Sequence, residues 1–364
     1  MKKTVKIKFV GMYSSFEWEG NYIIDVIKKF YDLQICEKSE DADYIFCSCF
    51  DFYEFCKYPQ VRIMFSGETY IPDFNYIDYA ISVFPLEYKG RHLSLPGFMG
   101  HKEYFETVNR RENDKSVLKS KTQFANFIFG HELSDGMRAK LFNKLSEYKR
   151  VDASGAYLNN MPNGEVATYF GTKNDFQKKT KFSIIVEGSY NNGYLSEKIW
   201  DAFRANTIPI FYGSDSVNNV FNKNAFINCS DYNSLDEVLE VVKALDNDDD
   251  AYLKMLNQPI FNDENYVVNK EKELDNFIKY IFEQPLDKAY RRERGNMTKI
   301  YSEYLIYTSA PDKFRKKIKN DEKQKNKIQR KRNVKLRLKQ LKNEKRYFRC
   351  FLTWVKYFWY LYLT

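Results

Sequence analysis

The chain has 364 residues and a mass of 43.5 kDa, with 43% hydrophobic and 29% charged residues. This apolar fraction excludes a disordered or fibrous protein, and the length predicts about two domains of ordinary size. The net charge of +9 is unevenly distributed, because Lys313–Arg349 contains 18 basic and 3 acidic residues and Lys356 adds one positive charge. Residues 1–312 therefore carry a net charge of −7, and the sequence predicts a mildly acidic folded body followed by a basic tail.

The first hundred residues alternate between strand-like and helix-like segments. Asn21–Tyr31 has the apolar periodicity of an amphipathic helix. Short apolar runs predict buried strands at Thr4–Val10, Asp43–Ser48, Val61–Phe65 and Tyr79–Val83. Strands separated by helices favour a parallel sheet that is covered on both faces.

A second strand–helix series follows the charged stretch His101–Lys121, which has little periodicity and is the predicted linker. The predicted elements are strands at Phe124–Phe129, Phe182–Val186 and Thr207–Tyr212, and helices at Gly136–Ser146, Ser196–Ala205 and Ser234–Ala244, the last capped by Asn233. Two α/β halves joined by a linker predict a ligand-binding cleft between them, at the carboxyl ends of the strands.

The cysteines and histidines lack the spacing of a zinc site. Cys47-x-Cys49 with Cys56 does not form the usual ligand pairs, and the chain has only three histidines. The acidic run Asp246–Asp250 is predicted to be a solvated loop and not a magnesium site. Two lysines interrupt the first apolar run, so we expect no signal peptide and a reducing, cytoplasmic compartment.

The stretch from Phe182 to Ser214 combines an apolar strand, a polar loop with glycines, a helix and a second apolar strand. Such a loop directs free N–H groups and the positive end of the helix dipole at its ligand, an arrangement that suits phosphate. Glu197 could accept hydrogen bonds from ribose hydroxyls, and Lys198 could neutralise a phosphate. The residues alone equally allow Glu197 to complement the helix dipole and Lys198 to be a solvated surface side chain.

Two further side chains are candidates for chemistry. Glu68 follows the predicted strand at Val61–Phe65, where a carboxylate could act as a general base or could cap the next turn. Arg138 lies early in a predicted helix, where it could bind phosphate oxygens with its planar guanidinium or be solvated.

Taken together, these stretches resemble the α1,3-fucosyltransferases, the inverting GDP-fucose-dependent enzymes of glycosyltransferase family 10. The hallmark of that family is close to F-x-x-x-x-E-N-[ST]-x-x-x-x-Y-[VIL]-[ST]-E-K-[IL]-x-x-A-[FY]-x-x-x-x-[IV]-P-[IV]. The positions that match it are Glu187, Ser189, Tyr194, Leu195, Ser196, Glu197, Lys198, Ile199, Ala202, Phe203, Ile208, Pro209 and Ile210.

Two other motifs carry the same resemblance. Bacterial members have T-G-E-N followed by P-x-F-N-x-x-D-Y-A-I, and this chain has Ser66-Gly67-Glu68-Thr69 followed by Pro72-Asp73-Phe74-Asn75 and Asp78-Tyr79-Ala80-Ile81. The stretch Phe124–Ile128, with Arg138 downstream, is similar to the F-x-x-F-V-x-S-N of the family and its following arginine. The resemblance covers roughly residues 5–285. It departs at Gly188, where the family has asparagine.

The resemblance implies a role for each matched residue. Glu68 would be the general base of catalysis. Arg138 and Lys198 would hold the donor diphosphate, Glu197 the ribose, and Tyr194 would line the donor pocket. The remaining predicted donor-binding positions are Glu187, Gly188 and Ser189. Because arginine and lysine supply the positive charge, the resemblance implies no metal and no cofactor besides the GDP-fucose substrate.

The implied fold is of the GT-B type, with two Rossmann-like α/β domains and a cleft between them. Residues 1–115 are predicted to form the acceptor-side domain with the general base, and residues 122–285 the GDP-sugar-binding domain. Residues 286–312, with a helix at Lys288–Tyr304, are predicted to pack back across the domains. Residues 313–364 are predicted to be a basic amphipathic tail.

The implied activity is the inverting transfer of L-fucose from GDP-fucose to the 3-hydroxyl of N-acetylglucosamine. The implied acceptor is an N-acetyllactosamine-type surface glycan, such as that of a lipopolysaccharide. One alternative is a glycosyltransferase with a different GDP-sugar donor, because Gly188 removes an amide from the donor-binding motif. A second alternative is a catalytically inactive protein that binds membranes or nucleic acid.

The basic tail ends in an aromatic segment, Tyr347–Thr364, rich in tryptophan and tyrosine. Such residues prefer the boundary between lipid and water, and basic residues bind anionic lipid. We therefore expect peripheral binding to the inner face of the cell membrane, in preference to nucleic-acid binding. Self-association is the other alternative, because Val334, Leu338 and Leu341 share one helical face.

Overall fold

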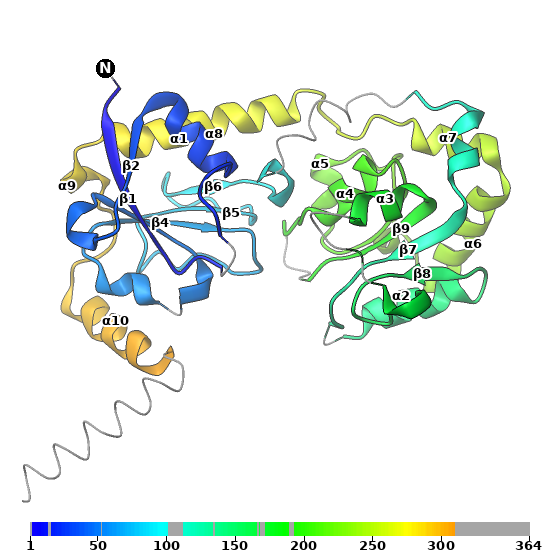
Figure 1. Cartoon of the computed structure of the whole chain (residues 1–364), viewed down its shortest axis with the longest axis horizontal. Helices are drawn as coiled ribbons and strands as arrows, with labels where there is room; N and C mark the ends of the chain where they lie inside the picture. The colour runs from blue at the N-terminus through cyan, green and yellow to red at the C-terminus, as the bar shows by residue number, and fades with distance from the viewer. Residues whose placement is uncertain are drawn as a thin grey trace, which may run out of the picture. The chain divides into compact units, whose positions relative to one another are not determined.

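The computed structural model describes residues 2–13, 16–51, 53–100, 112–133, 135–165, 167, 172–188 and 193–309. Its strands form two sheets, one in each half of the chain (Figure 1). The strand order is β2-β1-β3-β4-β5-β6 in the first sheet and β11-β10-β9-β7-β8 in the second. Adjacent strands are parallel in both sheets, so the prediction of two parallel α/β halves is confirmed.

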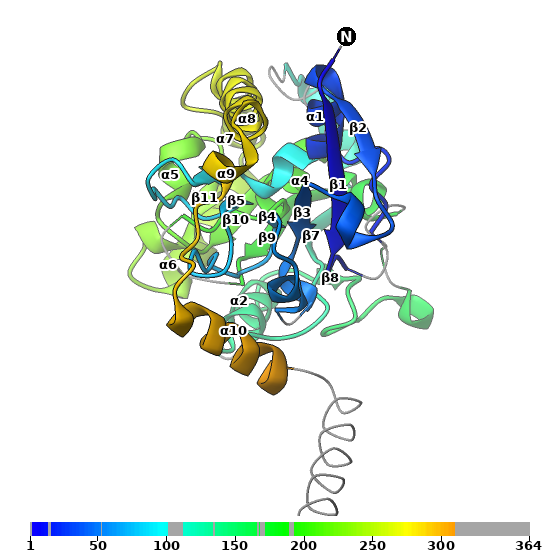
Figure 2. The same cartoon turned by 90° about the vertical axis from the view of Figure 1, so that its left-hand side faces the viewer.

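The first sheet comprises β1 (Thr4–Val10), β2 (Asp32–Ile35), β3 (Tyr44–Cys47), β4 (Val61–Ser66), β5 (Tyr79–Ser82) and β6 (His92–Ser94). The helical segments of this half are α1 (Tyr22–Phe30), η1 (Ser39–Asp41), η2 (Cys49–Asp51), η3 (Glu54–Lys57) and η4 (Gly97–Gly100). Figure 2 shows β2 beside β1 at one edge of the sheet. The strand predicted at Thr4–Val10 has these bounds in the structure, whereas β2 and β6 were not predicted.

The second sheet comprises β7 (Gln123–Phe127), β8 (Val151–Ala153), β9 (Thr180–Val186), β10 (Ile208–Tyr212) and β11 (Ile227–Asn228). Its accompanying segments are η6 (Lys115–Ser120), α2 (Met137–Ser146), η7 (Pro162–Gly164), α3 (Lys173–Lys178), α4 (Lys198–Arg204), α5 (Val217–Val220), η8 (Cys229–Asp231), α6 (Leu235–Asn247) and α7 (Asp249–Leu256). The chain continues into α8 (Tyr266–Glu283), α9 (Leu286–Ala289) and α10 (Asn296–Ser309).

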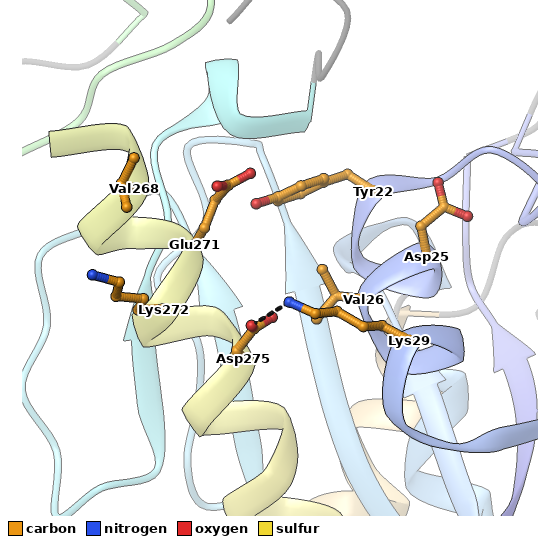
Figure 3. Close-up of a pocket in the computed structure, with 8 residues that line it drawn as sticks. All are labelled: Tyr22, Asp25, Val26, Lys29, Val268, Glu271, Lys272 and Asp275. Carbon is orange, nitrogen blue, oxygen red and sulfur yellow. Dashed lines mark hydrogen bonds and ion pairs between the residues drawn. The ribbon is translucent and has the colours of Figure 1, made fainter. Parts of the chain in front are cut away.

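Helix α8 contributes to the hydrophobic core of the first sheet. It belongs to the segment predicted to form the sugar-nucleotide domain, yet it packs beside α1, as Figure 3 shows. Its buried face, which includes Leu274, Ile278 and Phe282, joins the same core cluster as Val5 and Ile7 of β1. The chain therefore returns to its first half after completing the second sheet.

The returning segment is fixed by Asp78, which is completely buried next to β5. Asp78 Oδ1 accepts hydrogen bonds from the backbone N–H of Arg291 at 2.7 Å and of Arg292 at 2.8 Å. Its Oδ2 accepts the backbone N–H of Arg62 at 2.7 Å and forms an ion pair with the Arg292 guanidinium. The helix predicted at Lys288–Tyr304 is interrupted here, because these two N–H groups bind a carboxylate and not the carbonyls of a preceding helical turn.

Two predictions for the end of the second half were wrong. Ser234, and not Asn233, caps α6, because its Oγ accepts the N–H of Glu237. The acidic run at Asp246–Asp250 is not a solvated loop: Asp246 is 8% exposed, and a network of two lysines and a tyrosine binds its carboxylate. Asp248 then caps α7 by accepting two backbone N–H groups.

Several predictions lie partly or wholly outside the described residues. They concern Ser189, the tail at residues 313–364 and residues 101–111 of the predicted linker. Among the helices that the structure does describe, none combines the length and the apolar character required to cross a membrane.

We expect Asp78→Asn to lower the free energy of unfolding by about 3–5 kcal/mol, because it leaves the buried Arg292 guanidinium without a compensating charge. Denaturant unfolding measures this difference. The matched control is Asp275→Asn. Asp275 Oδ2 lies 2.5 Å from Lys29 Nζ, and 57% of the Lys29 side chain is exposed. That change should cost no more than about 1 kcal/mol. Equal effects of the two substitutions would contradict the importance of the buried pair.

Candidate functional site

Loops that follow three strands of the first sheet meet the segment between β9 and α4. After β6, the N–H of Gly97 donates to the carbonyl of Leu195 at 3.5 Å. After β5, the ring of Phe84 lies 5.7 Å from that of Tyr194, measured between centroids. After β4, Thr69 Cγ2 lies 3.7 Å from the position of a Cβ on Gly188. The carboxyl ends of strands from both sheets therefore meet at this place, as expected for parallel α/β folds.

The close approach of these loops requires glycine at position 193. Gly193 has a φ of +95°, and a Cβ there would overlap the ring of Pro85. Its N–H donates to Ser214 Oγ at 3.0 Å, in the turn that follows β10. Any larger residue would have to separate the two loops or leave this backbone conformation.

The electrostatic surroundings of Tyr194 show which predicted residues lie near one another. Burial raises the pKa of its hydroxyl, and the negative charges of Glu187, Glu197 and Glu68 raise it further. The positive charge of Arg138 acts in the opposite direction. Four other predicted site residues therefore lie within electrostatic range of Tyr194.

Glu68 lies two residues beyond the end of β4, and its side chain is exposed. Its backbone N–H donates to Ser66 Oγ at 3.2 Å, and its carbonyl accepts the N–H of Tyr70 at 2.7 Å. These bonds form a compact turn that holds the backbone of Glu68 while the carboxylate remains accessible. The Glu68 carboxylate is therefore open to a ligand that binds at this end of the sheet.

Glu197 and Lys198 form a charged pair at the start of α4. Lys198 Nζ lies 3.5 Å from Glu197 Oε1, and their side chains are 26% and 28% exposed, respectively. Burial opposes ionisation of Glu197, but the charges of Lys198 and Lys173 outweigh it and lower the pKa of the carboxyl. Burial likewise opposes the charge on Lys198, but Glu197 and Glu187 outweigh it and raise the pKa of the amine. Both groups are therefore charged near neutral pH.

Glu187, which was predicted to bind the donor, lies beneath this pair and is completely buried. Its Oε1 accepts the N–H of Ser196 at 3.0 Å and the Oγ–H of Ser196 at 2.9 Å. Burial raises the pKa of Glu187, although Lys198 and the bonds from Ser196 act in the opposite direction. Gly213 leaves room for this side chain, because a Cβ there would lie 3.1 Å from Glu187 Cβ.

Arg138 is also less accessible than predicted. Its guanidinium carbon lies 4.4 Å from the centroid of the Phe129 ring, and its Nη1 donates to the carbonyl of His131 at 2.5 Å. The carboxylate of Glu132 accepts the N–H groups of Arg138 and Ala139 at the start of α2. The amino-terminal N–H groups of α2 are thus already hydrogen-bonded within the chain, while the Arg138 charge acts on both Tyr194 and Lys198.

Comparison with known families agrees with this arrangement. Residues 118–275 match the carboxyl-terminal domain of glycosyltransferase family 10 (fucosyltransferase), and residues 7–101 match the amino-terminal domain of the alpha-(1,3)-fucosyltransferase FucT. The first match contains the site residues from Arg138 to Lys198, and the second contains Glu68. The chain belongs to glycosyltransferase family 10.

Individual relatives from the same family align with smaller parts of this chain than the two family domains do together. The chain is 29% identical over 228 residues to the alpha-(1,3)-fucosyltransferase FucT of Helicobacter pylori, which covers 54% of this chain and 46% of that protein. It is 28% identical over 144 residues to 4-galactosyl-N-acetylglucosaminide 3-alpha-L-fucosyltransferase 9 of Homo sapiens, which covers 38% of each. These matches span less than half the length of either relative.

A solved structure of an alpha1,3-fucosyltransferase has the same fold. It aligns with a TM-score of 0.68 and 24% identity over 80% of this chain and 92% of that one. A structure of an alpha1,3-fucosyltransferase with GDP-fucose aligns with a TM-score of 0.64 and 24% identity over 80% of this chain and 94% of that one. The predicted GT-B fold class is thus confirmed.

The family motifs did not indicate three residues that shape this site. Lys173 influences Glu197 electrostatically and forms a 2.6 Å ion pair with the buried Asp201. Glu132 caps α2, and Gly213 accommodates Glu187. Only Gly213 had a signal in the sequence, since a glycine directly after a predicted strand marks a turn.

The described residues contain no cluster of acidic, histidine or cysteine side chains that could hold a metal ion. A separate groove of about 430 Å³ lies between α1 and α8 (Figure 3). Its lining includes Tyr22, Asp25 and Lys29 of α1 and Glu271, Lys272 and Asp275 of α8. It contains none of the residues that match the family motifs.

Proposed function

We propose that this chain transfers L-fucose from GDP-fucose to the 3-hydroxyl of N-acetylglucosamine, with inversion at the sugar carbon. Its family membership and the names of its relatives support a GDP-fucose-dependent α1,3-fucosyltransferase. The observation that carries the proposal is the meeting of two loops, one with the exposed carboxylate of Glu68 and the other leading to Lys198. These loops approach each other at Thr69 and Gly188, since Thr69 Cγ2 lies 3.7 Å from where a Cβ on Gly188 would stand.

In the proposed reaction, Glu68 removes the proton from the acceptor hydroxyl. The acceptor oxygen forms a bond to C1 of fucose as the bond from C1 to the β-phosphate oxygen breaks, and GDP leaves with the bonding electrons. Because attack and departure occur on opposite faces of C1, the configuration inverts. A carboxylate is a suitable base here, since the hydroxyl becomes much more acidic as the new bond forms.

The departing diphosphate requires positive charge that is already in place. Lys198 is the proposed donor to the phosphate oxygens, and Arg138 adds positive charge in its neighbourhood. Fixed cations stabilise the negative charge that develops on the leaving group without reorganising during the step. Glu197, held ionised by Lys198 and Lys173, is the proposed acceptor for the ribose hydroxyls. This scheme uses no metal ion.

We expect Glu68→Gln to lower kcat by about 10²–10⁴-fold, because the amide cannot take up the proton of the acceptor. Its affinity for GDP should stay within about twofold of that of the unaltered chain, since Glu68 does not contact the leaving group in the proposed reaction. Transfer assays and titration calorimetry with GDP measure the two quantities. The control is Glu40→Gln, which makes the same change at an exposed carboxylate elsewhere in the chain, in η1.

An undiminished kcat in Glu68→Gln would refute the role of this residue as the base. Absence of transfer by the unaltered chain from every GDP-sugar would instead favour the alternative of an inactive binding protein. A panel of GDP-sugar donors therefore belongs in the same assay.

The alternative of a different GDP-sugar donor rests on Gly188. Among the described residues, a Cβ at this position would meet only Thr69, at the ordinary contact distance of 3.7 Å. These residues thus leave room for a Cβ at position 188. The missing amide is the only departure among the positions predicted to bind the donor.

We expect Gly188→Asn to raise kcat/KM for GDP-fucose by about tenfold, because one recovered hydrogen bond in the transition state stabilises it by about 1.4 kcal/mol. The donor panel measures this change, and Gly188→Ala is the control for the added Cβ alone. A preference of the unaltered chain for another GDP-sugar, reversed towards GDP-fucose in Gly188→Asn, would establish the alternative donor.

We also propose that residues 313–364 bind the inner face of the cell membrane, which would place the protein in the cytoplasm at that surface. The support is the sequence: a segment with a net charge of +15 precedes an aromatic terminus. A chain that ends at Asp312 should lose its binding to anionic vesicles and still transfer sugar to a soluble acceptor. Equal vesicle binding by the shortened chain would refute the proposal.

A further inference from the structure

Glu187 matches the family motif for the donor site, yet it is completely buried in this structure. The residue has a relative exposure of 0% and lies directly beyond the end of β9. Its backbone N–H donates to the carbonyl of Tyr212 at 2.9 Å, which ties it to the end of β10. Its contribution to the site must therefore pass through the residues that it contacts.

The first of these residues is Ser196. Glu187 Oε1 accepts both the N–H and the Oγ–H of Ser196, at 3.0 and 2.9 Å. A serine hydroxyl that donates in this way has its lone pairs available for other donors. Glu187 thus fixes the backbone and the side chain of Ser196 at the same time.

The available lone pairs of Ser196 are used by Lys198. Ser196 Oγ accepts the backbone N–H of Lys198 at 3.2 Å and lies 3.2 Å from Lys198 Nζ, which donates to it. A continuous series of hydrogen bonds therefore connects the buried carboxyl of Glu187 to the ammonium of Lys198. The ammonium has three N–H groups, so donation to Ser196 leaves others for an anion.

The turn after β10 also supports the hydrogen bonds that connect Glu187, Ser196 and Lys198. Gly213 makes room for the side chain of Glu187, and Ser214 Oγ accepts the N–H of Gly193. The segment from Gly193 to Lys198 is consequently held near both of its ends. A lysine side chain alone is flexible, so such support is needed to fix its charge at one place.

The hydrogen bonds to Ser196 do not depend on the charge of Glu187. Burial raises its pKa, and its Oε2 has no hydrogen-bond partner among the residues that the structure describes. Both the neutral and the ionised carboxyl can accept the two bonds from Ser196 through Oε1.

We propose that Glu187 is a positioning residue that acts through Ser196 to hold the Lys198 ammonium where the diphosphate of a nucleotide sugar binds. This inference rests on the proposed function. It assigns to Glu187 a role in orienting a donor-binding cation, in place of direct contact with the donor.

The test compares two substitutions of similar volume. Glu187→Gln keeps a neutral oxygen acceptor for Ser196, whereas Glu187→Leu fills the space without one. Glu187→Leu should weaken GDP binding, and lower kcat/KM for the donor, by at least about tenfold. The reason is that it removes the hydrogen bonds that hold Ser196 and, through Ser196, the Lys198 ammonium. Glu187→Gln should stay within about threefold of the unaltered chain. The KM for the acceptor should be the same in all three proteins.

A double-mutant cycle keeps the test decisive if Glu187→Leu does not fold. Ser196→Ala should weaken GDP binding by about tenfold in the unaltered background. It should have no further effect in Lys198→Met, because Ser196 acts through the lysine. An equal loss in both backgrounds would overturn the proposal, since it would reveal a general structural role.

The remaining outcomes are also distinguishable. If the unaltered chain binds GDP and Glu187→Leu binds it equally well, Glu187 does not position Lys198. An equal loss in Glu187→Gln and Glu187→Leu would also refute the inference, because it would show that an ionised carboxylate is required. If the unaltered chain does not bind GDP, the proposed function fails and the inference fails with it.

Discussion

Burying a carboxylate costs several kcal/mol unless donors surround it, and each half of this chain has a carboxyl side chain with an exposure of 0%, Asp78 and Glu187. Asp78 binds three backbone N–H groups and the guanidinium of Arg292. Glu187 binds the N–H and the hydroxyl of Ser196. Each carboxyl joins segments that are distant in sequence or that leave regular structure. The arrangement of the functional loops depends on both.

The two groups solve the problem of burial in different ways. Asp78 is paired with a buried cation, and the pair fixes the return of the chain from α8 to the first sheet. Glu187 accepts its hydrogen bonds from Ser196, with no cation bonded to it among the described residues, and burial raises its pKa. A paired charge suits a permanent joint between segments. An acceptor that binds Lys198 only through Ser196 leaves other N–H groups of the lysine ammonium available to a ligand.

Local sequence patterns predicted those features that depend on neighbouring residues. The apolar runs at β1, β3, β4, β5, β9 and β10 are buried strands because each pairs on both sides within a parallel sheet or closes against helices. The break at residues 290–295 was missed, because its cause is Asp78, more than 200 positions away. Asp246 was misjudged for the same reason, since Lys149 and Lys181 are remote in sequence.

In the candidate site too, the sequence predicted some features and not those that depend on the folded chain. Motif spacing was enough to select Glu68, Arg138, Glu187 and Glu197, whose charges all act on Tyr194. It could not separate the accessible Glu68 from the buried Glu187, since both are glutamates within two residues of the end of a strand. Nor could it show that Glu132 already occupies the start of α2. Depth below the surface and competition for donors are properties of the folded chain.

Two asparagines of the family motifs, those of T-G-E-N and E-N-[ST], are replaced here by Thr69 and Gly188. These positions are 119 residues apart in sequence, yet Thr69 Cγ2 lies 3.7 Å from where a Gly188 Cβ would stand. The two departures from the motifs thus lie close together in the folded chain. Because neighbouring residues influence one another energetically, they are better understood as one local change. That change lies where the loop with the proposed base approaches the loop of the proposed donor site, at positions other than Glu68, Glu197 and Lys198.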